Sequence, residues 1–190
     1  MNVYCFAILL SFYSCFQLVA EESNFEFKDI KGNEVVYFDD PKIKASVFIF
    51  ITIDCPIANS FSPEIKRLYE QFNHEQVAFT LVYVDRDMTL KKALKHAKDY
   101  GLLEIEHIVI DRDHKIVKLS KAEMTPQAVI MSSNQDIVYS GAINNLFSGY
   151  GDKKRQASQH YLKDNLTNYL SGEKIKYKNT KLFGCYIPKD

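Results

Sequence analysis

The sequence has no excess of charge of either sign, and this absence excludes a first class of functions. Its 190 residues carry 24 basic and 24 acidic side chains, so the formal net charge at pH 7 is zero. A nucleic-acid-binding protein usually has a basic excess, because contacts to phosphates supply most of its affinity. Internal repeats and low-complexity linkers are also absent, and glycine and proline are few, with 7 and 5 residues. These absences indicate a globular chain that does not bind nucleic acid.

Charged residues are missing altogether from the first 20 positions, and charge begins abruptly at Glu21. Residues 3–10 form a nearly continuous apolar run, and residues 18–20 (Leu-Val-Ala) resemble a cleavage site. This pattern predicts that residues 1–20 are a secretory signal peptide, with an uncleaved N-terminal membrane anchor as the main alternative. Lipid attachment at Cys15 is a weaker third alternative. We therefore expect an exported protein, periplasmic or secreted, that contacts a membrane only if the leader stays uncleaved.

Cysteine is scarce once the leader is set aside, because only Cys55 and Cys185 remain of the four. Two cysteines are too few for a disulfide-rich scaffold, but they suffice for one bridge in an oxidising compartment. The residues alone leave open a reactive pair, a static disulfide and two unrelated thiols. The five histidines show no metal-ligand spacing, so the sequence predicts no metal centre.

Strand and helix patterns alternate along the rest of the chain. Continuous apolar runs rich in β-branched and aromatic residues predict buried strands, and apolar residues three and four positions apart predict helices. Because strands and helices alternate before a final hairpin, we expect an α/β fold with a central mixed sheet and helices on both faces. The predicted strands are 34–38, 45–52, 77–84, 107–110, 127–131 and 136–140, and the predicted helices are 60–72, 90–100, 112–121 and 158–170.

Cys55 stands between a predicted buried strand and a predicted helix. The carboxyl ends of strands are where open α/β sheets place their active sites. A thiol in the first turn of a helix faces unpaired N–H groups that favour the thiolate, which is the nucleophile. Pro56 suits the first helical position, whereas the carboxylate of Asp54 opposes a second negative charge. The alternative is that Cys55 is a small buried residue at a helix start.

Several motifs together resemble a known family. Thr52-x-x-Cys55-Pro56 resembles the end of the peroxiredoxin signature. With Thr125-Pro126 and the motifs at 54–60, 158–162 and 184–187, it makes residues 25–188 similar to exported redoxin-domain proteins. These belong to the alkyl hydroperoxide reductase/thiol-specific antioxidant branch of the thioredoxin superfamily. The resemblance implies a thioredoxin-like domain over residues 25–172 and a tail, residues 173–190, that carries Cys185 and is able to fold back.

The resemblance also implies an activity and a role for each site residue. Cys55 would be the nucleophile and Cys185 the resolving cysteine, while Thr52 would position the substrate and Pro126, in a cis peptide bond, would shape the site. The substrate would be a peroxide or a disulfide of a protein or small molecule, and a dithiol would be the reductant. Neither an organic cofactor nor a metal is implied.

The sequence also departs from the patterns of related families. Ala58 stands where thioredoxins have the second cysteine of Cys-x-x-Cys, and Asn59 stands where copper chaperones of the Sco type have theirs. No arginine lies near Thr125, so Arg112 or Arg155 would have to contact a peroxide. Two alternative functions therefore stay open. One is a periplasmic Cu(I) chaperone using Cys55, Cys185 and His160, and the other is a non-catalytic interaction protein.

Three polar motifs have simpler structural explanations. The Asp-Arg-Asp sequences at 85–87 and 111–113 follow strands and precede helices, a position that predicts helix capping rather than metal binding. For the helix predicted over 90–100, we expect the cap to be Asp87 or Thr89. His160 opens the last predicted helix, where a capping or surface role is the alternative to a role at the site. The sequon Asn165-Leu166-Thr167 falls inside the same predicted helix, and we attribute it to chance.

Overall fold

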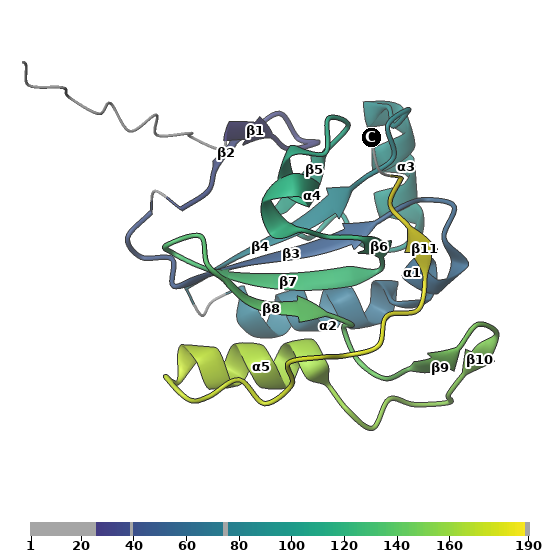
Figure 1. Cartoon of the computed structure of the whole chain (residues 1–190). Helices are drawn as coiled ribbons and strands as arrows, with labels where there is room; N and C mark the ends of the chain where they lie inside the picture. The colour runs from purple at the N-terminus through teal and green to yellow at the C-terminus, as the bar shows by residue number, and fades with distance from the viewer. Residues whose placement is uncertain (1–25, 39, 74–75, 189–190) are drawn as a thin grey trace, which may run out of the picture.

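The computed structural model describes residues 26–38, 40–73 and 76–188 (Figure 1). The predicted leader, residues 1–20, lies outside this part of the chain. Within it, no helix combines the length and the apolar character that crossing a membrane requires.

A five-stranded mixed sheet forms the centre of the fold, in the order β5-β4-β3-β7-β8. Strands β3 (Ala45–Ile51), β4 (Val77–Tyr83) and β5 (His107–Ile110) run parallel. Strands β7 (Gln127–Ser132) and β8 (Ile137–Gly141) form the antiparallel side. Every residue of β3 is buried, as its continuous apolar run predicts. The predicted α/β fold with a central mixed sheet is confirmed.

Both faces of the sheet are covered, because successive side chains of β3 point to opposite sides. Ile49 and its alternate neighbours pack on one face with helices α2 (Ser62–Phe72), α3 (Leu90–Asp99) and α5 (Tyr161–Leu170). Phe48 and Phe50 pack on the other face with helix α4 (Lys115–Ser120). The hairpin of β1 (Glu26–Lys28) and β2 (Glu34–Val36) lies at this second face. Figure 1 shows α2 and α5 on the opposite side of the sheet from α4.

The structure corrects the start of three predicted helices. The helix predicted over 60–72 is two helices, α1 (Pro56–Ser60) and α2, which meet at Phe61. Pro63 explains the break, because it has no N–H to donate to the carbonyl four residues earlier. The helix predicted over 112–121 begins only at Lys115, since His114 has a left-handed backbone with φ 53°. The helix predicted from residue 158 begins at Tyr161.

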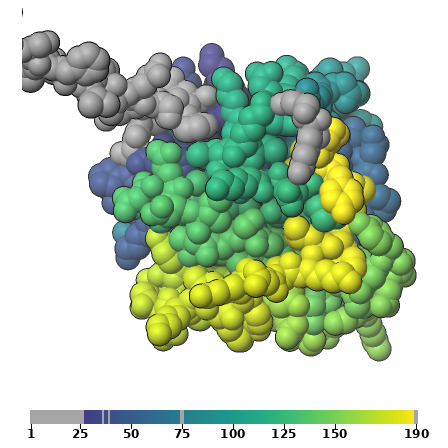
Figure 2. Space-filling model, viewed as in Figure 1, coloured from purple at the N-terminus to yellow at the C-terminus, as the bar shows by residue number. Residues whose placement is uncertain are grey.

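The C-terminal tail folds back across the domain. From α5 it runs past β8 to the carboxyl end of β3, and Figure 2 shows it as a continuous yellow band on the surface. There β11 (Cys185–Tyr186) pairs antiparallel with β6 (Met124–Thr125). The N–H of Ile187, which is buried, donates to the carbonyl of Glu123 at 2.9 Å. The tail therefore brings residues from the end of the chain to the predicted site.

Two polar side chains, one in α5 and one in the tail itself, fix the path of the tail. Asn165, fully buried in α5, accepts from the N–H groups of Lys176 and Tyr177 and donates to the carbonyl of Tyr177 at 2.8 Å. The hydroxyl of Thr180 accepts from the N–H of Ala142 at 2.9 Å. Asn165 thus has a structural role, and its buried, fully bonded amide is inaccessible to glycosylation in the folded chain.

Candidate redox site

Cys55 and the Thr125–Pro126 loop lie side by side. Cys55 is the N-cap residue of α1, and its side chain has 0% exposure. Its Sγ donates to the carbonyl oxygen of Thr125 at 3.3 Å. The peptide bond between Thr125 and Pro126 is cis, so the predicted isomer is confirmed. Two segments far apart in the sequence therefore form one wall around the sulfur of Cys55.

Cys185 completes the site from the tail. It lies opposite Thr125 in the β11–β6 pair, its thiol is close enough to that of Cys55 to interact with it, and both cysteines are free thiols. Partial burial of its sulfur, the hydrogen bond to Cys55 and the charge of Cys55 raise the pKa of Cys185 to about 11. Cys185 is an exposed residue, so the burial concerns the side of its sulfur that faces the loop. At neutral pH Cys185 is therefore a protonated thiol in contact with Cys55.

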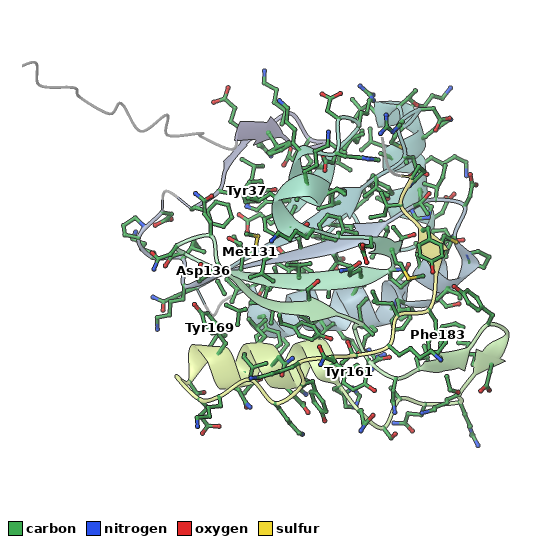
Figure 3. The ribbon with its side chains drawn as sticks, in the orientation of Figure 1. Tyr37, Met131, Asp136, Tyr161, Tyr169 and Phe183 are labelled. Carbon is green, nitrogen blue, oxygen red and sulfur yellow. The ribbon has the colours of Figure 1, made fainter. Side chains whose placement is uncertain are left out.

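Gly184 lets the tail come this close to the loop. A Cβ at this position would lie 1.9 Å from the carbonyl oxygen of Thr125, which leaves no room for any other residue. The carbonyl of Gly184 accepts from the hydroxyl of Tyr150 at 3.2 Å, and the ring of Tyr150 meets that of Phe183 edge to face. Figure 3 shows Phe183 beside the hairpin of β9 (Phe147–Gly149) and β10 (Asp152–Lys153). The hairpin thus holds the segment that carries Cys185.

Thr52 and Asp85 shape the loop that precedes Cys55. The hydroxyl of Thr52 donates to one carboxylate oxygen of Asp85, and the other oxygen accepts from the N–H of Ile53 at 3.4 Å. The hydroxyl of Thr52 is therefore turned toward Asp85, at the carboxyl end of β4, in this structure.

The capping prediction for the two Asp-Arg-Asp sequences is right for one and wrong for the other. Asp111 accepts from the N–H groups of Lys115 and Val117 at 2.7 and 2.9 Å, and so caps α4. Asp85 supports the loop before Cys55, and the cap of α3 is Thr89, whose hydroxyl accepts from the N–H of Lys92.

Three side chains to which the sequence assigns no role at the site support the same loop. The hydroxyl of Tyr83 lies 2.8 Å from Nδ1 of His96, and Nε2 of His96 lies 3.0 Å from Oδ1 of Asn59. Nδ2 of Asn59 donates to the carbonyl of Ile53 at 2.9 Å. With Nδ2 committed as a donor, Oδ1 must accept from Nε2 of His96, so Nδ1 accepts from Tyr83. The result is a directed chain of hydrogen bonds from β4 to the residues just before Cys55.

The burial of His96 keeps this chain neutral. Burial lowers the pKa of His96, against the opposing attraction of Asp85, Asp99 and Asp54. A neutral imidazole is one donor and one acceptor, which is what its two neighbours require. Tyr83 and Asn59, the partners of His96, are far from it in the sequence. The only sequence signal that these residues support the loop is the position of Asn59, one helical turn after Cys55.

The remaining candidates contact residues other than the two cysteines. His160 is the N-cap residue of α5 without a side-chain capping bond, and its Nδ1 lies 3.7 Å from a carboxylate oxygen of Glu64. Nε of Arg112 donates to the carbonyl of Met88 at 2.7 Å, and Arg155 lines a surface hollow together with His160. Over the described ranges, no three His, Cys, Asp or Glu side chains cluster as a metal would need.

The sheet, the N-cap cysteine and the cis proline beside it define a thioredoxin-like fold. Residues 44–137 match a family model described as thioredoxin-like, so this part of the chain is a thioredoxin-like domain. The match runs from the start of β3, through the loop that carries Cys55, to the first residue of β8. No curated protein matches the sequence.

Solved structures of similar fold extend the likeness to nearly the whole chain. An uncharacterized conserved protein from Geobacillus kaustophilus is 20% identical, with a TM-score of 0.75 over 88% of this chain and 89% of its own. A protein from Sinorhizobium meliloti is 19% identical, with a TM-score of 0.71 over 87% and 90%. A secreted disulfide oxidoreductase from Mycobacterium tuberculosis, homologous to Escherichia coli DsbE, is 14% identical, with a TM-score of 0.52 over 78% and 96%.

Proposed function

We propose that this protein is an exported thiol oxidoreductase that cycles between the Cys55/Cys185 dithiol and the corresponding disulfide. One observation carries the proposal. The tail places the thiol of Cys185 close enough to that of Cys55 for the two to interact, beside the Thr125–Pro126 loop that Cys55 contacts and that carries the cis peptide bond.

The two thiols have different roles in the proposed cycle. Cys55 is fully buried while β11 is paired with β6, so the tail moves aside before a substrate reaches it. The thiolate of Cys55 then attacks one sulfur of a substrate disulfide, and the other sulfur leaves as a thiolate that takes up a proton. The raised pKa of Cys185 keeps this thiol from competing as the first nucleophile. Cys185 then loses its proton and attacks the Cys55 sulfur of the mixed disulfide. The second half of the substrate leaves as a thiol. The substrate disulfide has then been reduced by two electrons and the protein oxidised to the Cys55–Cys185 disulfide, which a dithiol reductant converts back to two thiols.

Of the two oxidants that the family resemblance implies, a disulfide is favoured over a peroxide. In the peroxide reaction Cys55 would become a sulfenic acid with release of an alcohol or water, and Cys185 would condense with it and release water. Thr52 would position the peroxide, but its hydroxyl is bound to Asp85. A disulfide needs no such donor beside the sulfur. The named relatives of similar fold include a disulfide oxidoreductase, which agrees with this preference.

Export is part of the same proposal. It is supported by the charge-free apolar segment at residues 1–20 and by the secreted protein from Mycobacterium tuberculosis among the solved structures of similar fold. Fractionation of cells that express the full chain, followed by N-terminal sequencing, tests it. Recovery of the full-length chain from the cytosol would contradict it.

A single experiment on the two cysteines tests the redox cycle. Reduced protein is mixed with a disulfide or with hydrogen peroxide, and the products are mapped by mass spectrometry. We expect wild type to form Cys55–Cys185, Cys185→Ser to stop at a mixed disulfide on Cys55, and Cys55→Ser to react with neither oxidant at a comparable rate. Peroxide consumption faster than disulfide reduction would shift the assignment to a peroxidase. Equal rates in wild type and Cys55→Ser would exclude both activities.

A further inference from the structure

A polar hollow adjoins the redox site and has no role in the cycle above. Its volume is about 250 Å³, and it lies between the start of α2 and the loop that leads to α5. Ser60 lines both this hollow and the one beside Asp54 and Pro56. Asn144 lines both this hollow and the one beside Pro126. The hollow therefore borders the surroundings of Cys55 on two sides.

Positive charge dominates the walls of this hollow although the chain as a whole is neutral. One carboxylate, that of Glu64, is paired with Arg67 at 2.7 Å and faces His160. Lys153 and Arg155, both exposed, also line the hollow, and over the described residues no carboxylate is paired with either. Nζ of Lys153 lies 5.9 Å from the centroid of the Phe147 ring. Two cationic side chains without a carboxylate partner thus lie around one small concavity.

An amide donor in the same wall also lacks a partner within the protein. Asn144 is only 5% exposed, and its Oδ1 accepts from the N–H of Leu146 at 2.9 Å, which fixes the orientation of the amide. Its Nδ2 has no hydrogen-bond partner among the described residues and is not one of the buried unpaired side-chain atoms, so solvent reaches it. A fixed N–H donor that is open to solvent beside two cations is available to an acceptor that enters the hollow.

We propose that this hollow binds a carboxylate of the substrate, and that the substrate is therefore a small acidic disulfide. The proposal rests on the proposed function and names the substrate class of the same site. The Arg155 guanidinium matches a carboxylate through paired N–H donors, Lys153 adds a point charge, and Asn144 donates a third bond. The volume suits one carboxylate-bearing arm of a ligand whose sulfur reaches toward Cys55 along the wall that Ser60 and Asn144 share.

Binding without chemistry is tested first. The Cys55→Ser, Cys185→Ser double variant of the mature chain is titrated by NMR with S-methylglutathione, which has two carboxylates and no reactive sulfur. The side-chain amide signal of Asn144 is the reporter. We expect it to shift on titration, and we expect Lys153→Gln with Arg155→Gln to weaken binding about tenfold, as loss of charge-assisted hydrogen bonds predicts. Lys163→Gln, an exposed lysine outside the hollow, is the matched control and should bind normally.

Kinetics test the link to turnover. Oxidised glutathione, which is acidic, is compared with hydroxyethyl disulfide, which is neutral. The Arg155→Gln change should raise KM about tenfold for the acidic substrate, with little change in kcat and none for the neutral one. Absence of an Asn144 shift, or equal binding by the wild-type and substituted hollows, would overturn the proposal. Binding that survives while neither disulfide is reduced would instead overturn the proposed function and leave the carboxylate site standing.

Discussion

Replacing Gly184 with alanine should separate the two cysteines without unfolding the domain. The added Cβ would lie 1.9 Å from the carbonyl oxygen of Thr125, 2.7 Å from its carbonyl carbon and 3.1 Å from Cδ of Pro126. Two of these three atoms are backbone atoms and cannot rotate away. Because real Cβ contacts are essentially never under 3.0 Å, β11 must move outward, by about 1 Å or more.

The size of the effect follows from what this movement disrupts. The β11–β6 pair spans only two residues, and the N–H of Ile187 adds one further bond to the same loop. Overpacking of a well-fitted contact costs about 1–3 kcal/mol. If that cost falls on the docked position of the tail, the population with Cys185 against Cys55 drops by about 5- to 150-fold. The tendency of the pair to form a disulfide should drop by the same factor.

Titration of the disulfide in glutathione redox buffers measures this tendency directly, and thermal unfolding of the reduced protein monitors the domain. Gly149→Ala is the matched control, because its Cβ would lie 3.5 Å from that of Asp152, an ordinary contact. We expect a large shift of the redox midpoint for Gly184→Ala and almost none for Gly149→Ala. If Gly184→Ala forms the Cys55–Cys185 disulfide as readily as wild type, the close docking of the tail is not what brings the thiols together.

Three further changes test other parts of the same arrangement. Asn165→Ala should lower the free energy of unfolding of the docked tail by about 1–3 kcal/mol, measured as faster proteolysis after residue 172, because the backbone groups of the tail lose buried partners. Alkylation of Cys185 followed against pH should give a pKa near 11, and Cys55→Ser should return it toward the ordinary 9.0. The folded state holds this proton more tightly, so stability should fall as pH rises from 9 to about 11. The pKa of His96 is lowered from 6.5, so stability should also fall as pH drops below 6.5, and His96→Gln should remove that slope in urea titrations.

The sequence predicts the sheet better than the helix ends. The runs at 45–52 and 77–84 differ from β3 and β4 by one residue each, because a strand buried on both faces is apolar throughout. Helix starts depend on single backbone conformations. The left-handed residue His114 delays α4, and nothing in its local sequence announces that conformation.

The sequence names the candidate site residues, but it predicts only some of the contacts between them. The neighbourhood of Cys55 and Pro126 follows from the order of the elements, since both stand at the same edge of the sheet. The role of Thr52 as a substrate contact stays a prediction, and its bond to Asp85 joins two strand ends whose side-chain directions the sequence does not give. Asn59 and His96 belong to the same class, because each acts through a partner on another element.

The tail shows how long-range placement depends on residues that look ordinary in the sequence. Cys185 meets Cys55 because a buried asparagine in α5, a threonine hydroxyl and a glycine without room for a Cβ each hold one point of the path. The asparagine belongs to a sequon, the threonine to a polar stretch and the glycine to a motif of four residues. The role of each residue in placing the tail is evident only from the group that it contacts, and these groups lie on other elements of the fold. The proposed reactivity of the cysteine pair therefore depends on the docked tail, and substitutions far from either sulfur should control it.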